Sequence, residues 1–191
     1  MNKIRLAILA SGSGSNAEAI MKWAAESSIV EVVCVLSDKR KAGVHERAKK
    51  LNVPSTYVIK KKNEDNTYHE QRIISHLQDH RPDWIILAGY MKLLGPHFLK
   101  TYPNKIINIH PSLLPLFPGL DGYGDAFKAQ VRESGCTIHY VDEGIDTGAI
   151  IAQKSFPLIP GESFEEFKHR GLAVENKFYP EVLEKLFTGL L

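Results

Sequence analysis

Short apolar runs alternate with helix-patterned segments along the first half of the chain. Four of these runs have the length of a buried strand: 4–9, 29–36, 56–59 and 83–88. Apolar residues between the runs recur at helical spacing, first at Ala17, Ile20, Met21 and Ala24. Because a helix separates each strand from the next, the strands are predicted to run parallel, with helices on both faces. The sequence therefore predicts an α/β fold with a Rossmann-like, open and mostly parallel sheet.

The C-terminal part of the chain predicts a different strand pairing. The apolar runs at 135–141 and 149–156 are joined by a loop that is too short for a helical crossover. The last strand is therefore expected to pair antiparallel with the one before it. A final helix is predicted from Ser163 to about Phe187, kinked or restarted at Pro180. Its predicted buried stripe is Phe164, Phe167, Val174 and Phe178.

Length and charge limit the classes of function. A chain of 191 residues suits one domain, and a net charge of +2 does not indicate nucleic-acid binding. Cys34 and Cys136 lie in apolar strand-like runs, which favours free buried thiols in a reducing compartment. No apolar run approaches the ~18 residues that span a membrane. The chain enters its first strand without a signal peptide, so we expect a cytoplasmic protein.

A glycine-rich turn, Ser11-Gly12-Ser13-Gly14-Ser15-Asn16, links the first strand to the first helix. Glycine lets a backbone approach a ligand closely, and a helix N-terminus offers N–H groups to an anion. The turn is neither a GxGxxG fingerprint nor a Walker loop. It is therefore either a phosphate-binding loop or a tight turn in which Ser15 or Asn16 caps the helix.

Asn108 and His110 stand two residues apart at the end of the predicted strand that begins at Lys105. Their side chains point to the same face because strand residues alternate. Pro111 stops the strand, so the amide and the imidazole lie at its carboxyl end, where ligands bind in open α/β sheets. The structural alternative is a turn-forming asparagine beside a hydrogen-bonded core histidine.

Two loops and one helix carry further candidates. The apolar segment 89–94 follows the fourth strand and is either core or the floor of a pocket for a flat ligand. The loop 142–148 is rich in acid and glycine, like many hairpin turns, and Asp146 matters only if it faces His110. His76 and His80 lie four apart on a predicted helix, but without a third ligand they predict no metal site.

Four segments together resemble the folate-dependent formyltransferases: 11–16, 87–91, 108–115 and 142–148. The similarity extends from the first strand to the last helix. The run Asn108 to Pro115, followed by Asp146, is highly specific for this family. Gly14-Ser15-Asn16 after the first strand is typical of the members that act on phosphoribosylglycinamide. The resemblance implies one formyltransferase domain over residues 1–191, with the formyltransferase fold.

The resemblance also implies a reaction. Its substrates are 5-phosphoribosylglycinamide and, as formyl donor, 10-formyltetrahydrofolate. Asn108 and a protonated His110 would donate hydrogen bonds to the tetrahedral oxyanion. Asp146 would keep His110 charged and accept the proton of the amine, directly or through a water. No metal is expected.

Binding residues are implied in the same way. Gly14, Ser15 and Asn16 would hold the substrate phosphate, and Glu175 the ribose or glycinamide end. The folate site would comprise Met91, Lys92, Leu93, Leu94, Asn108, Val141, Asp142 and Asp146. One position departs from the family, because Asn66 stands where an arginine near the folate is common. Lys60 to Lys62 are nearby cations and are the candidates to replace it.

Three other functions compete with this interpretation. A formyltetrahydrofolate deformylase has the same Asn, His and Asp but carries an extra N-terminal domain. A methionyl-tRNA formyltransferase needs a C-terminal tRNA-binding domain. A non-catalytic phosphate-binding module would explain 14–16 but not the combination of Asn108, His110 and Asp146. The expected partners are small-molecule substrates, without nucleic acid or membrane, for a monomer or a homodimer.

Overall fold

The computed structural model describes residues 2–191 and divides the chain into two compact units, one ending at Ile107 and one formed by Asn108–Leu191. The helices and strands follow in this order: β1 Ile4–Leu9, α1 Ser15–Glu26, β2 Val30–Ser37, α2 Val44–Lys50, β3 Ser55–Tyr57, α3 Asn66–His80, β4 Trp84–Leu87, α4 Pro96–Thr101, β5 Ile106–His110, α5 Gly122–Lys128, β6 Glu133–Tyr140, β7 Ile150–Pro157 and α6 Phe164–Phe187. The predicted alternation of strands and helices is confirmed.

The strand order is β3-β2-β1-β4-β5-β6-β7. β1 pairs in parallel with β2 and β4, and β2 pairs in parallel with β3. β7 runs antiparallel to β6, as the short loop between them predicts. The predicted fold class, a mostly parallel α/β sheet with an antiparallel strand near the C-terminus, is therefore confirmed.

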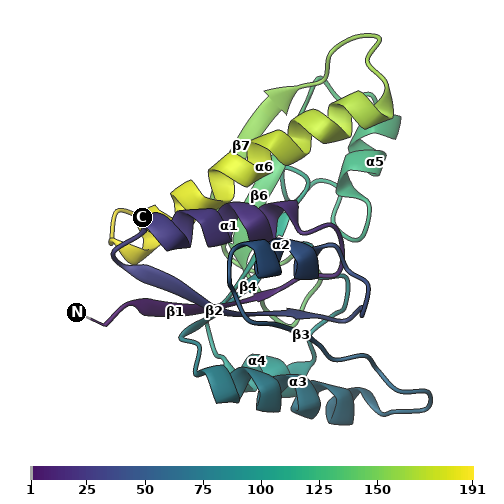
Figure 1. The fold of residues 1–191 in the computed structure, drawn as a ribbon. Helices are drawn as coiled ribbons and strands as arrows, with labels where there is room; N and C mark the ends of the chain where they lie inside the picture. The colour runs from purple at the N-terminus through teal and green to yellow at the C-terminus, as the bar shows by residue number, and fades with distance from the viewer. Residues whose placement is uncertain (1) are drawn as a thin grey trace. The chain divides into compact units, whose positions relative to one another are not determined.

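The first unit is a parallel sheet covered on both faces. Figure 1 shows α1 and α2 on one face of its strands and α3 and α4 on the other. The centre of β1 is fully buried, with Leu6, Ala7, Ile8 and Leu9 at 0% exposure. Helix α1 buries Ala17, Ile20, Met21 and Ala24, which is the predicted apolar face. β1 and β4 end at the same edge, because parallel neighbours share one direction.

In the second unit, α6 packs against both strands of the antiparallel pair β6–β7, and α5 packs against α6. Its aromatic cluster consists of Tyr123, Phe156 and Phe167. The predicted stripe of α6 is wrong in part, because Phe164, Val174 and Phe178 are only half-buried. The buried line contains Phe167, Gly171, Glu175 and Tyr179. A periodicity argument that counts apolar residues misses a buried glycine and a buried carboxylate.

The structure also tests the predictions about the last helix, the two cysteines and membrane-spanning segments. α6 continues through Pro180 without a restart. Cys34 and Cys136 are free and buried, as predicted, and burial raises the pKa of Cys34 to about 12. Over residues 2–191, no helix is long and apolar enough to cross a membrane. The single-domain assignment of residues 1–191 stays a prediction.

Candidate active site

The glycine-rich loop of the first unit is held by α2. Arg47 Nε donates to Ser13 O at 2.8 Å, and its guanidinium forms an ion pair with Glu18. Val44 N donates to Gly12 O at 3.3 Å. These contacts fix the backbone of the loop from a neighbouring helix. The loop is therefore ordered by tertiary contacts as well as by its own turn.

Gly14 is the N-cap of α1, with φ of 79° and no side-chain cap hydrogen bond. The suggestion that Ser15 or Asn16 is the cap is therefore wrong. A Cβ at Gly14 would lie 2.6 Å from Val44 Cβ and 2.8 Å from Val44 Cα. Only glycine fits both the left-handed backbone and the close approach of α2. The first turn of α1 therefore has no side-chain cap, and its N–H groups are directed beyond the N-terminal end of the helix.

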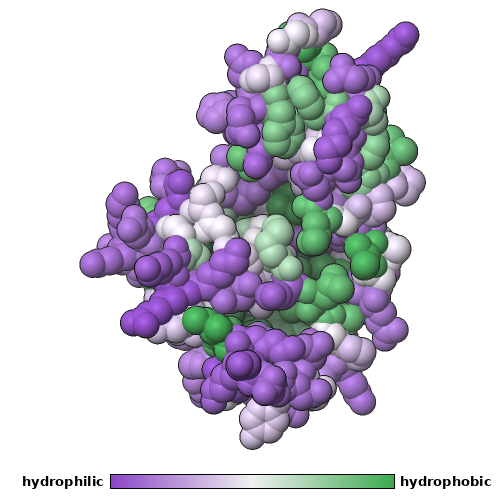
Figure 2. Space-filling model, turned by 90° about the vertical axis from the view of Figure 1, so that its right-hand side faces the viewer, coloured by the Kyte–Doolittle hydropathy of each residue, from purple (hydrophilic) through white to green (hydrophobic). Residues whose placement is uncertain are grey.

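The segment 91–94 lies beside this loop at the same sheet edge. Ser11 N donates to Gly89 O at 3.0 Å, and Met91 N donates to Ser11 Oγ at 2.8 Å. Met91 and Leu93 are exposed, by 51% and 75%. Figure 2 shows exposed hydrophobic side chains as green patches on a largely hydrophilic surface. The exposure excludes the core interpretation for Met91, Lys92 and Leu93, and the pocket-floor interpretation stays a prediction.

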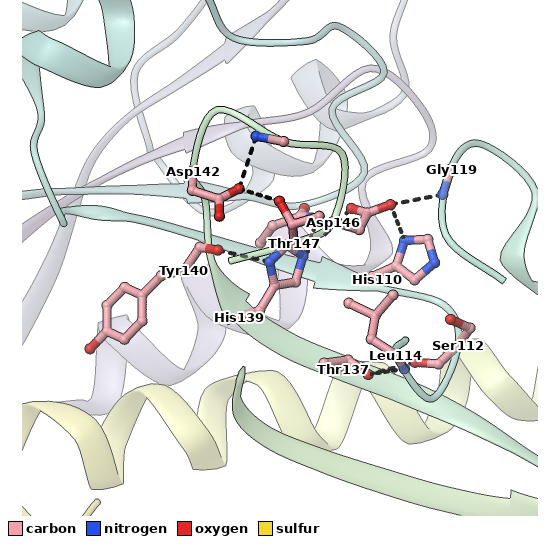
Figure 3. A network of polar contacts seen from close by, with 12 residues as sticks. His110, Ser112, Leu114, Gly119, Thr137, His139, Tyr140, Asp142, Asp146 and Thr147 are labelled. Atoms are coloured by element: carbon pink, nitrogen blue, oxygen red, sulfur yellow. Dashed lines mark hydrogen bonds and ion pairs between the residues drawn. The ribbon is translucent and has the colours of Figure 1, made fainter. Parts of the chain in front are cut away.

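The second unit brings the predicted polar residues 108, 110 and 146 together, as Figure 3 shows for His110 and Asp146. β5 supplies Asn108 and His110, and the loop after β6 supplies Asp146. His110 Nδ1 lies 3.2 Å from Asp146 Oδ2. The His110 side chain is 3% exposed and that of Asp146 is 13% exposed. This ion pair is nearly sequestered from water, which strengthens its electrostatic coupling.

Both ring nitrogens of His110 face acceptors. Nδ1 faces the Asp146 carboxylate, and Nε2 lies 2.8 Å from the carbonyl oxygen of Phe117. Neither acceptor can donate a hydrogen, so both contacts are hydrogen bonds only when both nitrogens carry a proton. The structure therefore favours the charged imidazolium. Its Nε2–H is also occupied by the Phe117 carbonyl, so a ligand oxygen at this position must share or displace that bond.

The backbone around Asp146 is unusual. Asp146 has φ of 53° and Phe117 also has φ of 53°, both in the left-handed region that non-glycine residues seldom adopt. Gly119 N donates to Asp146 Oδ2 at 2.8 Å. The 117–119 segment thus contacts both partners of the ion pair. Such strained residues cluster at functional sites, because surrounding structure must hold them there.

Asp142 has a different place in the same loop. Its Oδ1 accepts from Gly144 N at 3.0 Å and from Thr147 Oγ1 at 2.7 Å, as the turn interpretation predicts. Asp142 is exposed and Val141 is half-buried. Asp142 stabilises the loop that presents Asp146. The tertiary structure thereby selects Asp146, and not Asp142, as the neighbour of His110.

The segment after His110 is fixed by β6 and β7. Thr137 Oγ1 donates to Ser112 O at 2.6 Å and accepts from Leu114 N at 3.0 Å. Gln153 Nε2 donates to Leu114 O at 2.9 Å. This network, part of which is visible in Figure 3, holds the chain that leaves His110. A satisfied polar network of this kind rigidifies the residues it joins.

His139 is a site residue that the sequence did not single out. It lies on β6, is 2% exposed, and places Nε2 3.2 Å from Asn108 Nδ2. The same Nε2 lies 3.6 Å from Asp146 Oδ1. A register shift between Ile138 and His139 interrupts the pairing with β7 at this point. In sequence, His139 looked like one more residue of an apolar strand, without a signal of its own.

Glu175 lies in the core of α6 at 4% exposure, and its carboxylate accepts from the Tyr123 hydroxyl at 2.5 Å. Burial and the nearby Glu175 raise the pKa of Tyr123 far above its ordinary value. A Cβ at Gly171 would lie 2.5 Å from the Tyr123 ring, so this glycine makes room for the pair. The contacts give Glu175 a structural role, and substrate binding by Glu175 stays a prediction.

The remaining candidates lie on or near α3. Lys60 Nζ donates to Asn66 Oδ1 at 2.5 Å, which sets a cation beside the position where the family commonly has arginine. His76 is exposed, and among residues 2–191 no group of three His, Cys, Asp or Glu side chains is placed to hold a metal.

Comparison with known proteins agrees with this arrangement. The sequence model of a family described as formyl transferase matches residues 4–183. The chain is 45% identical to the phosphoribosylglycinamide formyltransferase of Bacillus subtilis (strain 168) over 188 residues, 95% of this chain and 94% of that protein.

Solved structures are similar in fold over nine tenths or more of this chain. Glycinamide ribonucleotide transformylase 1 from Geobacillus kaustophilus is 45% identical, with a TM-score of 0.93 over 97% of this chain and 100% of that one. The enzyme of the same name from Symbiobacterium toebii is 37% identical, with a TM-score of 0.94 over 98% and 89% of the two chains. With a family match over residues 4–183 and relatives aligned nearly end to end, this chain belongs to the formyl transferase family.

Proposed function

We propose that the chain transfers the formyl group of 10-formyltetrahydrofolate to the amine of 5-phosphoribosylglycinamide, a step of purine biosynthesis. The observation that carries the proposal is the buried His110–Asp146 ion pair, with the Asn108 amide on the same strand. Two hydrogen-bond donors beside a carboxylate suit acyl transfer, because an oxyanion and an acidic proton form together. The names of the relatives support the choice of these substrates.

The proposed reaction has two steps. The glycinamide nitrogen attacks the formyl carbon, and the electron pair of the C=O bond moves onto oxygen. Asn108 Nδ2–H and His110 Nε2–H donate to this oxyanion, and Asp146 accepts the proton of the new ammonium, directly or through a water. The oxyanion then collapses, the bond from carbon to N10 of the folate breaks, and N10 takes up the proton that Asp146 or its water accepted from the amine. Formyl-folate is consumed as a substrate.

The charged His110 suits the first step. Because both of its ring nitrogens face acceptors, the contacts suit an imidazolium already in the unliganded protein. A charged donor stabilises an oxyanion more strongly than a neutral one. During the reaction the oxyanion replaces or shares the Phe117 carbonyl as partner of Nε2. Asp146 keeps the charge in place from the other side of the ring.

The proposed contacts with the substrates are assigned to segments of each unit separately. We assign the substrate phosphate to the backbone of Gly14, Ser15 and Asn16, at the uncapped start of α1. We assign folate contacts to Met91–Leu94 in the first unit, and to Asn108, Val141–Asp142 and Asp146 in the second. Glu175 is assigned to the ribose or glycinamide end. A cytoplasmic location and a monomer or homodimer complete the proposal.

Turnover of formyl-folate should require the nucleotide. With phosphoribosylglycinamide present, the folate absorbance should change at full rate, and without it the rate should fall to near zero. Phosphate-free glycinamide riboside is the control for the phosphate site. Hydrolysis of formyl-folate at full rate without the nucleotide would instead identify a deformylase.

Replacing Gly14 with alanine should weaken nucleotide binding by at least about tenfold, since the new Cβ meets Val44 and moves the backbone off the phosphate. Formyl-folate binding should persist, and calorimetric titration of each ligand separates the two. Gly161→Ala is the matched control, because Gly161 also has a left-handed φ, of 84°, but no atom within 4 Å of its Cβ position. Equal loss in both variants would rule out a specific role for Gly14.

A further inference from the structure

His139 faces two different kinds of partner with its two ring nitrogens. Nδ1 lies 2.8 Å from the carbonyl oxygen of Tyr140, which can only accept, so Nδ1 carries a proton. In the neutral ring, Nε2 is then an acceptor. The group at 3.2 Å from Nε2 is the Asn108 amide nitrogen, which can only donate. The contacts therefore define the neutral Nδ1–H tautomer, and Figure 3 shows the Nδ1 side of the ring facing the Tyr140 carbonyl.

This tautomer orients the amide of Asn108. An asparagine side chain can rotate by half a turn, which exchanges its oxygen and its nitrogen. An acceptor at His139 Nε2 favours the nitrogen on that side and disfavours the oxygen. One N–H then binds His139, and the second N–H remains on the same nitrogen as a donor for a ligand. The reversed amide would present an oxygen, which repels an oxyanion.

We propose that His139 is a positioning residue, which as a neutral acceptor holds the Asn108 amide with its nitrogen toward the reacting oxygen. The proposal rests on the proposed role of Asn108 as an oxyanion donor. His139 itself does not contact the substrate. Its burial at 2% exposure and its hydrogen bond to the Tyr140 carbonyl fix the ring, so the amide it binds is fixed as well. Such preorganisation is the source of oxyanion stabilisation.

The charge of His139 matters because Asp146 is near. Asp146 Oδ1 lies 3.6 Å from Nε2, beyond a hydrogen bond for the neutral ring but within reach of a charged one. A protonated His139 would release Asn108 and compete with His110 for Asp146. Burial is the largest influence and lowers the pKa of His139. The hydrogen bond to the Tyr140 carbonyl and the charges of Asp146 and Asp142 raise this pKa, whereas the positive charge of His110 lowers it. The ring is thus kept neutral near pH 7.

The first test uses the unmodified protein. Nitrogen-15 NMR of the histidine rings at pH 7.5 should show His139 protonated at Nδ1 and unprotonated at Nε2, with His139→Gln providing the assignment. Protonation at Nε2, in the other tautomer or in the imidazolium, would overturn the proposal. This measurement needs no substrate, so it stands apart from the question whether the reaction is the proposed one.

The second test uses two variants. Gln places an amide oxygen near the position of Nε2 and should keep kcat within about threefold, whereas His139→Leu removes the acceptor. We expect His139→Leu to lower kcat about 10- to 100-fold, the range for side chains that orient metal ligands, with both KM values nearly unchanged. Circular dichroism checks that both variants fold. A glutamine variant as impaired as the leucine variant would contradict the proposal.

A double-mutant cycle identifies the partner of His139. In an Asn108→Ala background, His139→Leu should change kcat by less than about twofold, because the amide that it orients is gone. Independent, multiplicative losses would show that His139 acts on something other than Asn108.

The ratio of wild-type to His139→Gln kcat gives a pH readout that a merely structural role would not move. It should be constant from pH 7 to 8 and fall in acid, since only the wild type gains a proton at position 139 as pH drops below the ordinary histidine pKa of about 6.5. The two proteins differ only at position 139, so the ratio isolates that side chain. A ratio that does not change down to the pH at which the protein unfolds would count against the neutral acceptor.

Discussion

Replacing Asp146 with asparagine should nearly abolish formyl transfer while leaving both substrates bound. Asparagine keeps the size of the side chain and can still accept from Gly119 N through its oxygen. That oxygen takes the Oδ2 position, which also faces His110 Nδ1, so the geometry is kept while the negative charge beside the ring is lost. Loss of the counter-charge disfavours the imidazolium form of His110, and no base remains for the amine proton. A loss of about 10⁴-fold in kcat is the scale for removing a carboxylate that orients a catalytic histidine.

Steady-state kinetics and nitrogen-15 NMR test this expectation together. The His110 ring should be charged less readily in the variant than in the wild type, and its neutral form should keep the Nδ1 proton, which the amide oxygen accepts. Glu143→Gln is the matched control, because it removes an exposed acid of the same loop without touching the ion pair. If Asp146→Asn leaves both turnover and the His110 ring unchanged, Asp146 is not the partner in catalysis.

Replacing Asn108 with alanine should lower kcat by roughly 10²–10³-fold, the effect of deleting one oxyanion donor. The change removes the amide that lies 3.2 Å from His139, but leaves the His110–Asp146 pair in place. KM for both substrates should change little, because the interaction forms chiefly in the transition state. The loss is expected to be smaller than for Asp146→Asn, since one donor and the base remain.

Asn108→Asp provides the sharper comparison. It has nearly the same shape as asparagine but no N–H, and it adds a negative charge beside the oxyanion. It should therefore be at least as impaired as Asn108→Ala. Thermal unfolding measures whether either variant is destabilised. Near-parental turnover in Asn108→Ala would remove this residue from the mechanism, whereas loss of both turnover and ligand binding would indicate a structural defect.

The sequence by itself determined the strand and helix order and the placement of Asn108 and His110. Hydrophobic periodicity is local, so the buried faces of β1 and α1 follow from consecutive residues alone. The shared face of Asn108 and His110 follows from the two-residue repeat of a strand, and the end of β5 at His110 follows from Pro111. The antiparallel β7 follows from the length of one loop.

Local patterns were insufficient where a residue's role depends on a distant partner. In α6 the buried line includes Gly171 and Glu175, because Tyr123 of another helix packs against the first and donates to the second. Counting apolar residues along α6 misses both. The cap of α1 is Gly14 and not a serine or asparagine, because α2 approaches too closely for a side chain.

Only the tertiary structure decided which acid faces His110 and what orients Asn108. Asp142 and Asp146 are the same residue type in the same loop. In the folded loop, Asp142 accepts a hydrogen bond within its own turn, whereas Asp146 faces His110. The sequence places His139 in an apolar strand without indicating a role, yet in the structure its ring contacts the Asn108 amide. Sequence spacing sets the face of each strand, whereas contacts between strands and loops depend on chain closure over long separations, which periodicity does not encode.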